Sequence, residues 1–384
     1  MTRLPKHIDA TPRPMPWVGN LPPARSPRTM SNGPGALESN ESVLPPSPAA
    51  VAAMAAATAG AHRYPAADSS ALLGVIADEW GLDPANVVVG NGSEELLRLL
   101  LAAYAGGGGR VAMADPACQV HKRACRLVGA DVVQRPLVNW AHDLSALADC
   151  PAHLAIVCNP HNPTGTAVRR HEMSEFLDHR RAGLVVVDEA YADFADDATG
   201  LSCASLIAQR RDLAVVRTFS KAYGLAAARV GYLLADPAVV DVVRKAQASF
   251  PVNAAAQAGA AAAMRDREYK ARVCSLTRAM RAHLTTVFAR AGYTVVPSQA
   301  NFVFVLAPDE DELVERLAAG GVRVRPGRSL GVAGSVRVTV PGEEGLRMVA
   351  EALGIPSDEV PAPSTSSGEP AAAPARCAGQ ARPC

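Results

Sequence analysis

Lys221 has the sequence setting of an amine nucleophile. It closely follows the apolar run 213–216. Thr218 and Ser220 come just before it, and Arg229 comes eight residues after it. An amine is nucleophilic only when neutral, so it has to be desolvated or placed beside other cations for part of it to be neutral near pH 7. The two hydroxyl groups and the guanidinium fork also suit a phosphate. The segment therefore predicts amine chemistry at a strand end, beside a phosphate.

A second set of phosphate donors is predicted upstream. The apolar run 87–89 gives way to a glycine turn, and a helical pattern begins near Leu96. By itself, a strand followed by a turn and a helix is common in α/β proteins and indicates no particular function. Beside another anion-binding group the interpretation changes, because backbone N–H groups at a helix N-terminus bind anions. The residues expected to act together, called the phosphate cradle below, are Gly92, Ser93, Glu94, Thr218, Ser220 and Arg229.

The segment 218–232 resembles the Ser/Thr-x-Ser-Lys-x-x-Gly-x-x-x-x-Arg-x-Gly signature of class I and II aminotransferases, the fold type I enzymes of pyridoxal 5′-phosphate (PLP). The string Asn-Pro-x-Asn-Pro-Thr-Gly at 159–165 resembles a second loop of this family. The resemblance implies that Lys221 carries PLP as a Schiff base and that Asn162 hydrogen-bonds its phenolate oxygen. It also implies an α/β fold: a large domain with a mostly parallel seven-stranded sheet flanked by helices, and a small α+β C-terminal domain.

Asp188 comes directly after the apolar run 184–187. This places it at the carboxyl end of a predicted parallel strand, where α/β sheets bind ligands. A carboxylate paired with the pyridine N–H keeps that nitrogen protonated, and the protonated ring is the electron sink of PLP chemistry. Tyr191 follows closely enough to donate to the phenolate oxygen, whereas Glu189 is expected to be structural.

Three further stretches resemble the histidinol-phosphate aminotransferase branch of the family. Asn40 and Glu41 match the start of the branch's Asn-Glu-Asn-Pro motif, whereas residues 42–44 depart from that motif. The resemblance places Asn40 at the substrate pocket. The counterpart of Tyr64 reaches the PLP phosphate of the neighbouring subunit, which implies a homodimer; a core tyrosine with a bonded hydroxyl is the alternative. His121 stands where the branch has an aromatic ring stacked on PLP, although a lone histidine is more often structural.

Arginines are candidates for binding the substrate. Arg337 lies in the apolar run 335–340, where the branch has an arginine that forks onto a substrate anion, the α-carboxylate when there is one. An edge-strand arginine facing water is the alternative. Arg323 and Arg325 alternate onto one face of a predicted strand. The resemblance favours Arg325 as a distal anion contact, but periodicity does not choose between the two.

The 384 residues are enough for more than one domain. We expect an extended arm over 1–34, whose proline density prevents helix, with a disordered tail as the alternative, and a large PLP-binding domain over 35–273. A small domain over 274–355 and a disordered tail over 356–384 complete the prediction. The small domain is expected to begin with a helix over 274–290. The elements predicted after it are strands at 293–296, 302–306, 322–324 and 336–340 and helices at 312–318 and 345–353.

Composition excludes other classes of protein. The net charge of +1 and the lack of a basic, aromatic-rich cluster predict no nucleic-acid partner. The sequence contains no run of 18 apolar residues, so it predicts no membrane span. Eight cysteines without zinc-type spacing predict no metal site and a cytoplasmic protein.

The predicted function is PLP-dependent transfer of an amino group between an amino acid and a 2-oxo acid. The amino acid is expected to be of the histidinol-phosphate or aromatic type, or an unusual one of specialised metabolism, which the alanine-, glycine- and proline-rich composition favours. Two alternatives stay open: a PLP-dependent decarboxylase of phosphorylated amino acids, and a non-catalytic PLP-binding regulatory domain.

Overall fold

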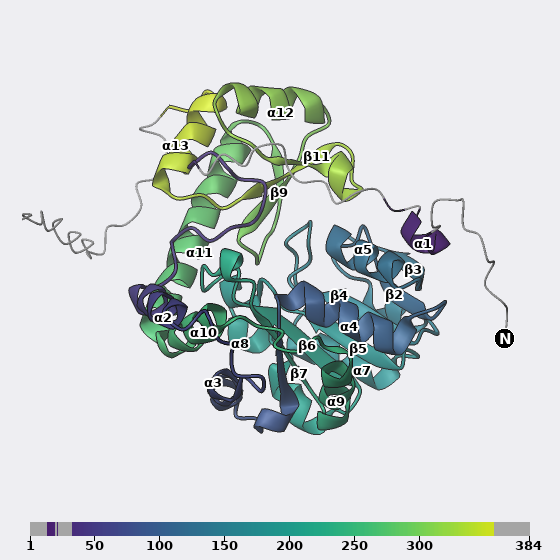
Figure 1. Cartoon of the computed structure of the whole chain (residues 1–384). Helices are drawn as coiled ribbons and strands as arrows, with labels where there is room; N and C mark the ends of the chain where they lie inside the picture. Colours follow the sequence, from purple (N-terminus) through teal and green to yellow (C-terminus); the bar gives the residue numbers. More distant parts are fainter. Residues whose placement is uncertain (1–13, 20, 22–32, 357–384) are drawn as a thin grey trace, which may run out of the picture.

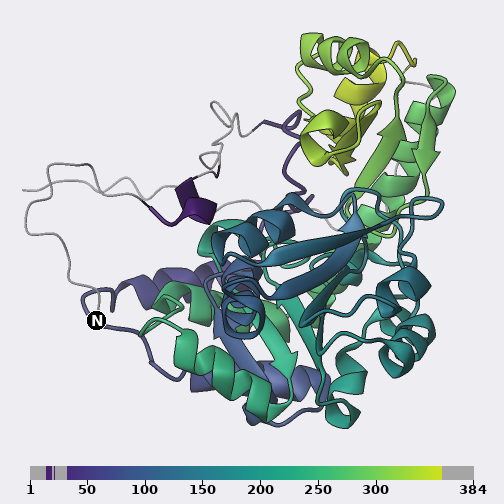
Figure 2. The ribbon, with the colours of Figure 1, turned by 90° about the vertical axis from the view of Figure 1, so that its right-hand side faces the viewer.

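The computed structural model describes residues 14–19, 21 and 33–356. These residues form a large body built on a seven-stranded sheet and a smaller body at one end of it (Figures 1 and 2). The rest of the predicted arm and nearly all of the predicted tail lie outside the described residues. Within the described part, no helix is long and apolar enough to cross a membrane.

The central sheet has the order β1-β7-β6-β5-β4-β2-β3. All neighbours are parallel except those of β7, which is antiparallel to both β1 and β6. The predicted fold class is confirmed. Two strands, β3 and β7, were not among the elements predicted from the sequence. The strands are β1 (Val87–Gly90), β2 (Arg110–Asp115), β3 (Asp131–Pro136), β4 (Leu154–Cys158), β5 (Leu184–Asp188), β6 (Leu213–Thr218) and β7 (Gly231–Ala235).

Helices cover both faces of this sheet, so its central strands are apolar on both sides. In β5, Val185 and Val187 pack into the core on one face, and Leu184 and Val186 pack into the core on the other. The helices of the large body are α2 (Pro48–Thr58), α3 (Ser70–Trp80), α4 (Ser93–Ala105), α5 (Gln119–Leu127), α6 (Leu144–Ala148), α7 (Arg170–His179), α8 (Ala198–Leu201), α9 (Pro237–Ala246) and α10 (Ala254–Arg265).

The smaller body is an antiparallel sheet of order β10-β11-β9-β8 covered by helices. Its core includes Leu37, which reaches it from the segment before α2. The elements are α11 (Arg267–Arg290), β8 (Thr294–Val296), β9 (Phe302–Leu306), α12 (Glu310–Ala319), β10 (Arg325–Pro326), β11 (Ser335–Thr339) and α13 (Glu343–Ala352).

Three predicted elements differ from the structure. The strand predicted at 322–324 is wrong: Arg323 makes only an isolated bridge with Ala36, and the strand is β10. Helix α11 begins seven residues before 274, because Asp266 caps it by accepting a hydrogen bond from the backbone N–H of Tyr269. The arm predicted to be extended contains a helical turn, α1 (Pro16–Gly19). Proline is tolerated in a first helical turn because its missing N–H has no partner there.

Candidate active site

A pocket of about 420 Å³ is lined by residues of both bodies. Parallel strands end at the same edge of a sheet, so the last residues of β5 and β6 contribute to one wall, and β10 and β11 contribute to another. The residues predicted for the site that line this pocket are Asn40, Ser93, Glu94, Asn162, Asp188, Tyr191, Thr218, Ser220, Lys221, Arg229, Arg325 and Arg337.

Lys221 Nζ lies inside the pocket. It donates hydrogen bonds to the backbone carbonyls of Ser39, at 3.1 Å, and Asn40, at 2.7 Å. Burial, reinforced by the nearby Arg337 guanidinium, lowers the pKa of Lys221 to about 8. At pH 7 about a tenth of such an amine is neutral, against less than about one in a thousand for an ordinary lysine. The amine therefore has the nucleophilic fraction that the sequence led us to expect.

The phosphate cradle forms at the N-terminus of α4. No side chain caps this helix, so the N–H groups of its first turn, including those of Ser93 and Glu94, are available to a ligand. Gly92, at φ +83°, lets Arg229 approach: a Cβ atom there would lie 2.7 Å from Arg229 Nη2. Gly231 is equally constrained, since its Cβ would lie 2.5 Å from the backbone N of Ser93. The glycines allow helix amides and guanidinium to face one anion.

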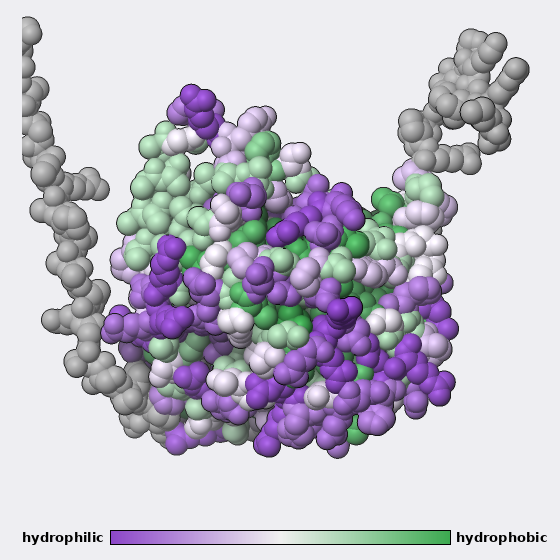
Figure 3. Space-filling view, turned by 90° about the horizontal axis from the view of Figure 1, so that it is seen from below, coloured by the Kyte–Doolittle hydropathy of each residue, from purple (hydrophilic) through white to green (hydrophobic). Residues whose placement is uncertain are grey.

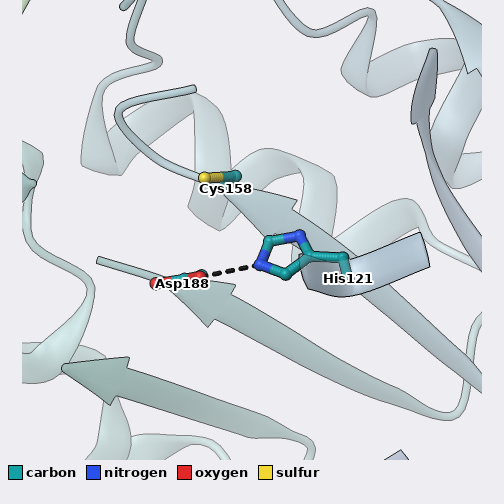
Figure 4. Close-up of side chains that lie close together, drawn as sticks. All are labelled: His121, Cys158 and Asp188. Atoms are coloured by element: carbon teal, nitrogen blue, oxygen red, sulfur yellow. Dashed lines mark hydrogen bonds and ion pairs between the residues drawn. The ribbon is translucent and has the colours of Figure 1, made fainter. Parts of the chain in front are cut away.

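Asp188 is held from two sides. The backbone N–H of Ala190 donates to its Oδ1 at 3.0 Å, and His121 Nε2 lies 2.7 Å from its Oδ2 (Figure 4). His121 is 2% exposed and comes from α5. Sequence reasoning predicted a ring stacked on PLP for His121 and did not foresee its contact with Asp188, 67 positions away.

Tyr191 and Asn162 lie together at the base of the pocket. The Tyr191 hydroxyl oxygen accepts hydrogen bonds from Asn162 Nδ2, at 3.1 Å, and from Asn40 Nδ2, at 3.2 Å. Burial raises the pKa of Tyr191, so the phenol keeps its proton. A hydroxyl that accepts two amide donors still has its own O–H to donate to a third group.

Arg337 and Arg325 are paired across β11 and β10. Arg337 donates from Nη1 to Asn162 Oδ1 at 2.8 Å, while its buried Nε has no partner in the described part of the chain. Arg325 lines the pocket without a hydrogen bond or ion pair to any described residue. Arg323, the alternative that the sequence left open, instead forms an ion pair with Glu38 at 3.1 Å. Both pocket arginines therefore have donors left for a ligand.

Tyr64 lies away from this pocket. It is 81% exposed and stacks on Phe250, with ring centroids 4.5 Å apart and planes 11° apart. The alternative of a core tyrosine is therefore wrong. Within the chain, its hydroxyl is not brought to the phosphate cradle.

Two contributors to the site had no clear sequence signal. Ser39 contacts Lys221 only through its carbonyl, which any residue carries. Asn301 donates from Nδ2 to the carbonyls of Asn40 and Glu41, at 3.1 Å each, and so holds the segment on which Lys221 rests. Glu189, expected to be structural, is buried and paired with Arg217, and neither residue is among those that line the pocket.

Residues 35–353 match the family model "Aminotransferase class I and II". The chain is 39% identical to histidinol-phosphate aminotransferase of Symbiobacterium thermophilum, over 83% of this chain and 89% of that protein. It is 38% identical to an aromatic amino acid aminotransferase of Thermobifida fusca, over 83% and 91% of the two chains. The structure of histidinol-phosphate aminotransferase from Sinorhizobium meliloti in complex with PLP superimposes with a TM-score of 0.80 and 26% identity, covering 90% and 98%.

The chain therefore belongs to the class I and II aminotransferase family. It is an aminotransferase, and the predicted family, enzyme class and PLP cofactor are confirmed. The pocket fits that cofactor: uncapped helix amides and Arg229 can receive a phosphate, Asp188 can receive a pyridine N–H, and Lys221 supplies a partly neutral amine.

Proposed function

We propose that the enzyme transfers the amino group of an amino acid with an anionic or aromatic distal group to a 2-oxo acid. The observation that carries this proposal is the convergence of Lys221, Asp188 and Arg337 on one pocket. Arg325 also lines it, and its side chain has no hydrogen bond or ion pair to any described residue. The relatives named for aromatic amino acids and for histidinol phosphate, whose side chain is an aromatic imidazole, support the aromatic class.

Bound PLP supplies an electron sink for the amino acid's α-carbon. Lys221 is proposed to hold the cofactor covalently, to be released by the substrate's amine, and then to move a proton as base and acid. Asp188 is proposed to keep the pyridine nitrogen protonated, and Asn162 and Tyr191 to donate to the phenolate oxygen. Arg337 is proposed to fork onto the substrate carboxylate. The phosphate cradle is proposed to hold the cofactor's phosphate.

The two bodies are proposed to act as domains, close to the predicted ranges 35–273 and 274–355, with helix α11, which begins at Arg267, crossing the boundary between them. Residues from both line the pocket, so a relative movement of the two would change access to Lys221. Free thiols at the six described cysteines support the proposal of a cytoplasmic enzyme, since a reducing compartment keeps cysteines in that state.

We also propose a homodimer. Helix α2 is apolar all round, yet one side of it is exposed, including Val51 at 51%. A helix of this kind indicates a surface that packs against something else. A pale green, hydrophobic area covers the left of the face seen in Figure 3, the side on which Figure 1 places α2 and α10. Tyr64 lies near α2 in sequence and is free to reach a second subunit.

Complementation tests the shared site. Co-expression of a Tyr64→Phe chain with a Lys221→Ala chain should form mixed dimers that each contain one intact site. Activity of the mixture is expected to be about a quarter of wild type, well above the mean of the two variants prepared alone. A mixture that only matches this mean would show that Tyr64 does not serve the neighbouring subunit.

The two pocket arginines should differ in their effect on specificity. Arg337→Ala is expected to lower kcat/KM roughly 10- to 100-fold for every amino acid, because each has an α-carboxylate. Arg325→Ala should lower it roughly tenfold only for substrates with an anionic side chain. Arg323→Ala, which alters an arginine outside the pocket, is the matched control. Equal losses for Phe and Glu in Arg325→Ala would contradict this assignment.

His121 is proposed to stack on the cofactor ring, and two substitutions separate this role from its contact with Asp188. His121→Phe keeps a flat ring and is expected to bind PLP within about threefold of wild type, while His121→Ala should bind it roughly 3- to 10-fold more weakly. Equilibrium dialysis measures both affinities. If phenylalanine weakens binding as much as alanine does, the hydrogen bond to Asp188 matters and stacking does not.

Substrate identity is tested by half-reactions with single amino donors. Loss of the bound cofactor's visible absorption is followed with histidinol phosphate, Phe, Tyr, Glu, Arg and phosphothreonine, and the products are identified by mass spectrometry. We expect a 2-oxo acid from an amino-acid donor, or a ketone from histidinol phosphate. Release of carbon dioxide would favour the decarboxylase, and no spectral change with any donor would favour the regulatory domain.

A further inference from the structure

Three side chains with metal-binding atoms meet at one edge of the central sheet. Cys158 ends β4, Asp188 ends β5, and the two are direct partners in the parallel pairing of these strands. Paired residues of adjacent parallel strands point to the same face. His121, from the first turn of α5, points at them from the side (Figure 4). One donor atom of each residue lies within 4.8 Å of the other two.

These donors form an ordered set in a dry environment. His121 and Cys158 are 2% and 3% exposed, and β4 and β5 are neighbours in the middle of the sheet. Nitrogen, sulfur and oxygen donors on one tetrahedral zinc-type ion are about 3.5 Å apart. To bind one, the wider pairs, up to 4.8 Å apart, have to come closer, and His121 Nε2 and Asp188 Oδ2, now 2.7 Å apart, have to separate slightly. An imidazole, a thiolate and a carboxylate suit Zn²⁺ or Co²⁺ and leave one coordination position open.

We propose that the PLP-free chain binds one Zn²⁺-type ion through His121, Cys158 and Asp188, and that PLP and the ion exclude one another. The exclusion rests on the proposed pairing of Asp188 with the cofactor's pyridine nitrogen. The ion replaces the hydrogen bond between His121 Nε2 and Asp188 Oδ2, and the imidazole proton of that bond moves to Nδ1. The ion also replaces the thiol proton that Cys158 Sγ now donates to the carbonyl of Pro160, so a metal–sulfur bond forms and one proton goes to solvent.

The surrounding charges make this site selective. Lys221 and Arg337 line the pocket that Asp188 also lines, and they repel a cation held only by electrostatics. For Zn²⁺ or Co²⁺, the strong bonds to a thiolate and an imidazole offset this repulsion. Mg²⁺ gains no such bonds, because it requires oxygen ligands and bound water. Cys118 lines this pocket and carries a thiol, but it is not one of the three residues with clustered donor atoms. It therefore provides a matched control.

Cobalt titration tests the proposal on the full chain. Bound PLP is removed with hydroxylamine, the protein is dialysed, and Co²⁺ is added while the thiolate-to-cobalt band in the near ultraviolet is recorded. We expect one Co²⁺ per chain in wild type and in Cys118→Ser. The band should be absent in Cys158→Ser, and affinity should fall at least about tenfold in His121→Phe. Reloading with PLP should release the Co²⁺.

Three results would overturn the proposal: no thiolate band in wild type, a band lost in Cys118→Ser but kept in Cys158→Ser, or full Co²⁺ binding by the PLP-loaded enzyme. Mg²⁺ in place of Co²⁺ should not bind measurably, and tight Mg²⁺ binding would contradict the selectivity. Failure here is distinguishable from failure of the proposed function, since PLP uptake and amino transfer by wild type are measured in the same preparation.

Discussion

Lys221→Ala is expected to lower kcat for amino transfer at least about 10⁴-fold. The substitution removes the buried amine that is proposed both to hold the cofactor and to move the proton. The pocket has no second amine to take its place among the residues that line it. Steady-state turnover with the preferred amino donor measures the effect.

Lys245→Ala provides the control for that experiment, because Lys245 is an exposed lysine at the end of α9. It should keep wild-type turnover. Lys221→Ala should remain folded, as judged by circular dichroism and thermal unfolding, since the lost side chain makes hydrogen bonds only to backbone carbonyls. A folded Lys221→Ala protein with turnover within tenfold of wild type would contradict the role given to this residue.

Asp188→Asn is expected to lower kcat roughly 10²- to 10³-fold, with a smaller effect on KM. An amide is nearly the same size as the carboxylate but carries no charge, so it does not hold the pyridine nitrogen protonated. Asp188→Glu keeps the negative charge but moves it by one methylene group, and it should retain more activity than Asp188→Asn. Asp241→Asn, at an exposed position of α9, is the control.

Stopped-flow kinetics locates the Asp188 effect. The proton-transfer step should slow, while association of the amino donor is unchanged. If Asp188→Asn slows only donor binding, the carboxylate serves the substrate and not the ring nitrogen. His121 contacts the same carboxylate, so a double variant with His121→Phe should show less than additive losses if the two residues act together.

Much of the site could be predicted because it is built from strand ends. Asp188 and Thr218 each follow a short apolar run, and in a parallel sheet such positions meet at one edge. The glycines around the phosphate cradle are also readable, since only glycine leaves room for Arg229 and for the N-terminus of α4. The positions of these residues follow from the sequence immediately around them, so they can be predicted from a single chain.

Contacts between distant segments could not be predicted in the same way. Asn301 supports the segment that holds Lys221 by bonding Asn40, 261 positions away, and His121 meets Asp188 only because the fold brings the first turn of α5 to the end of β5. Strand β7 was not predicted because it begins at Gly231, inside the segment 218–232 that had been interpreted as the lysine signature. Only the three-dimensional packing shows that Arg325, and not Arg323, lines the pocket.

Borohydride reduction of the purified protein, followed by peptide mapping, tests the central claim most directly. Reduction fixes the cofactor to whichever amine holds it, and mass spectrometry then identifies the modified lysine. We predict one pyridoxyl group per chain, on Lys221, and none on Lys221→Ala treated in the same way. A pyridoxyl group on a different lysine, or on none, would contradict the claim that this pocket is organised around Lys221.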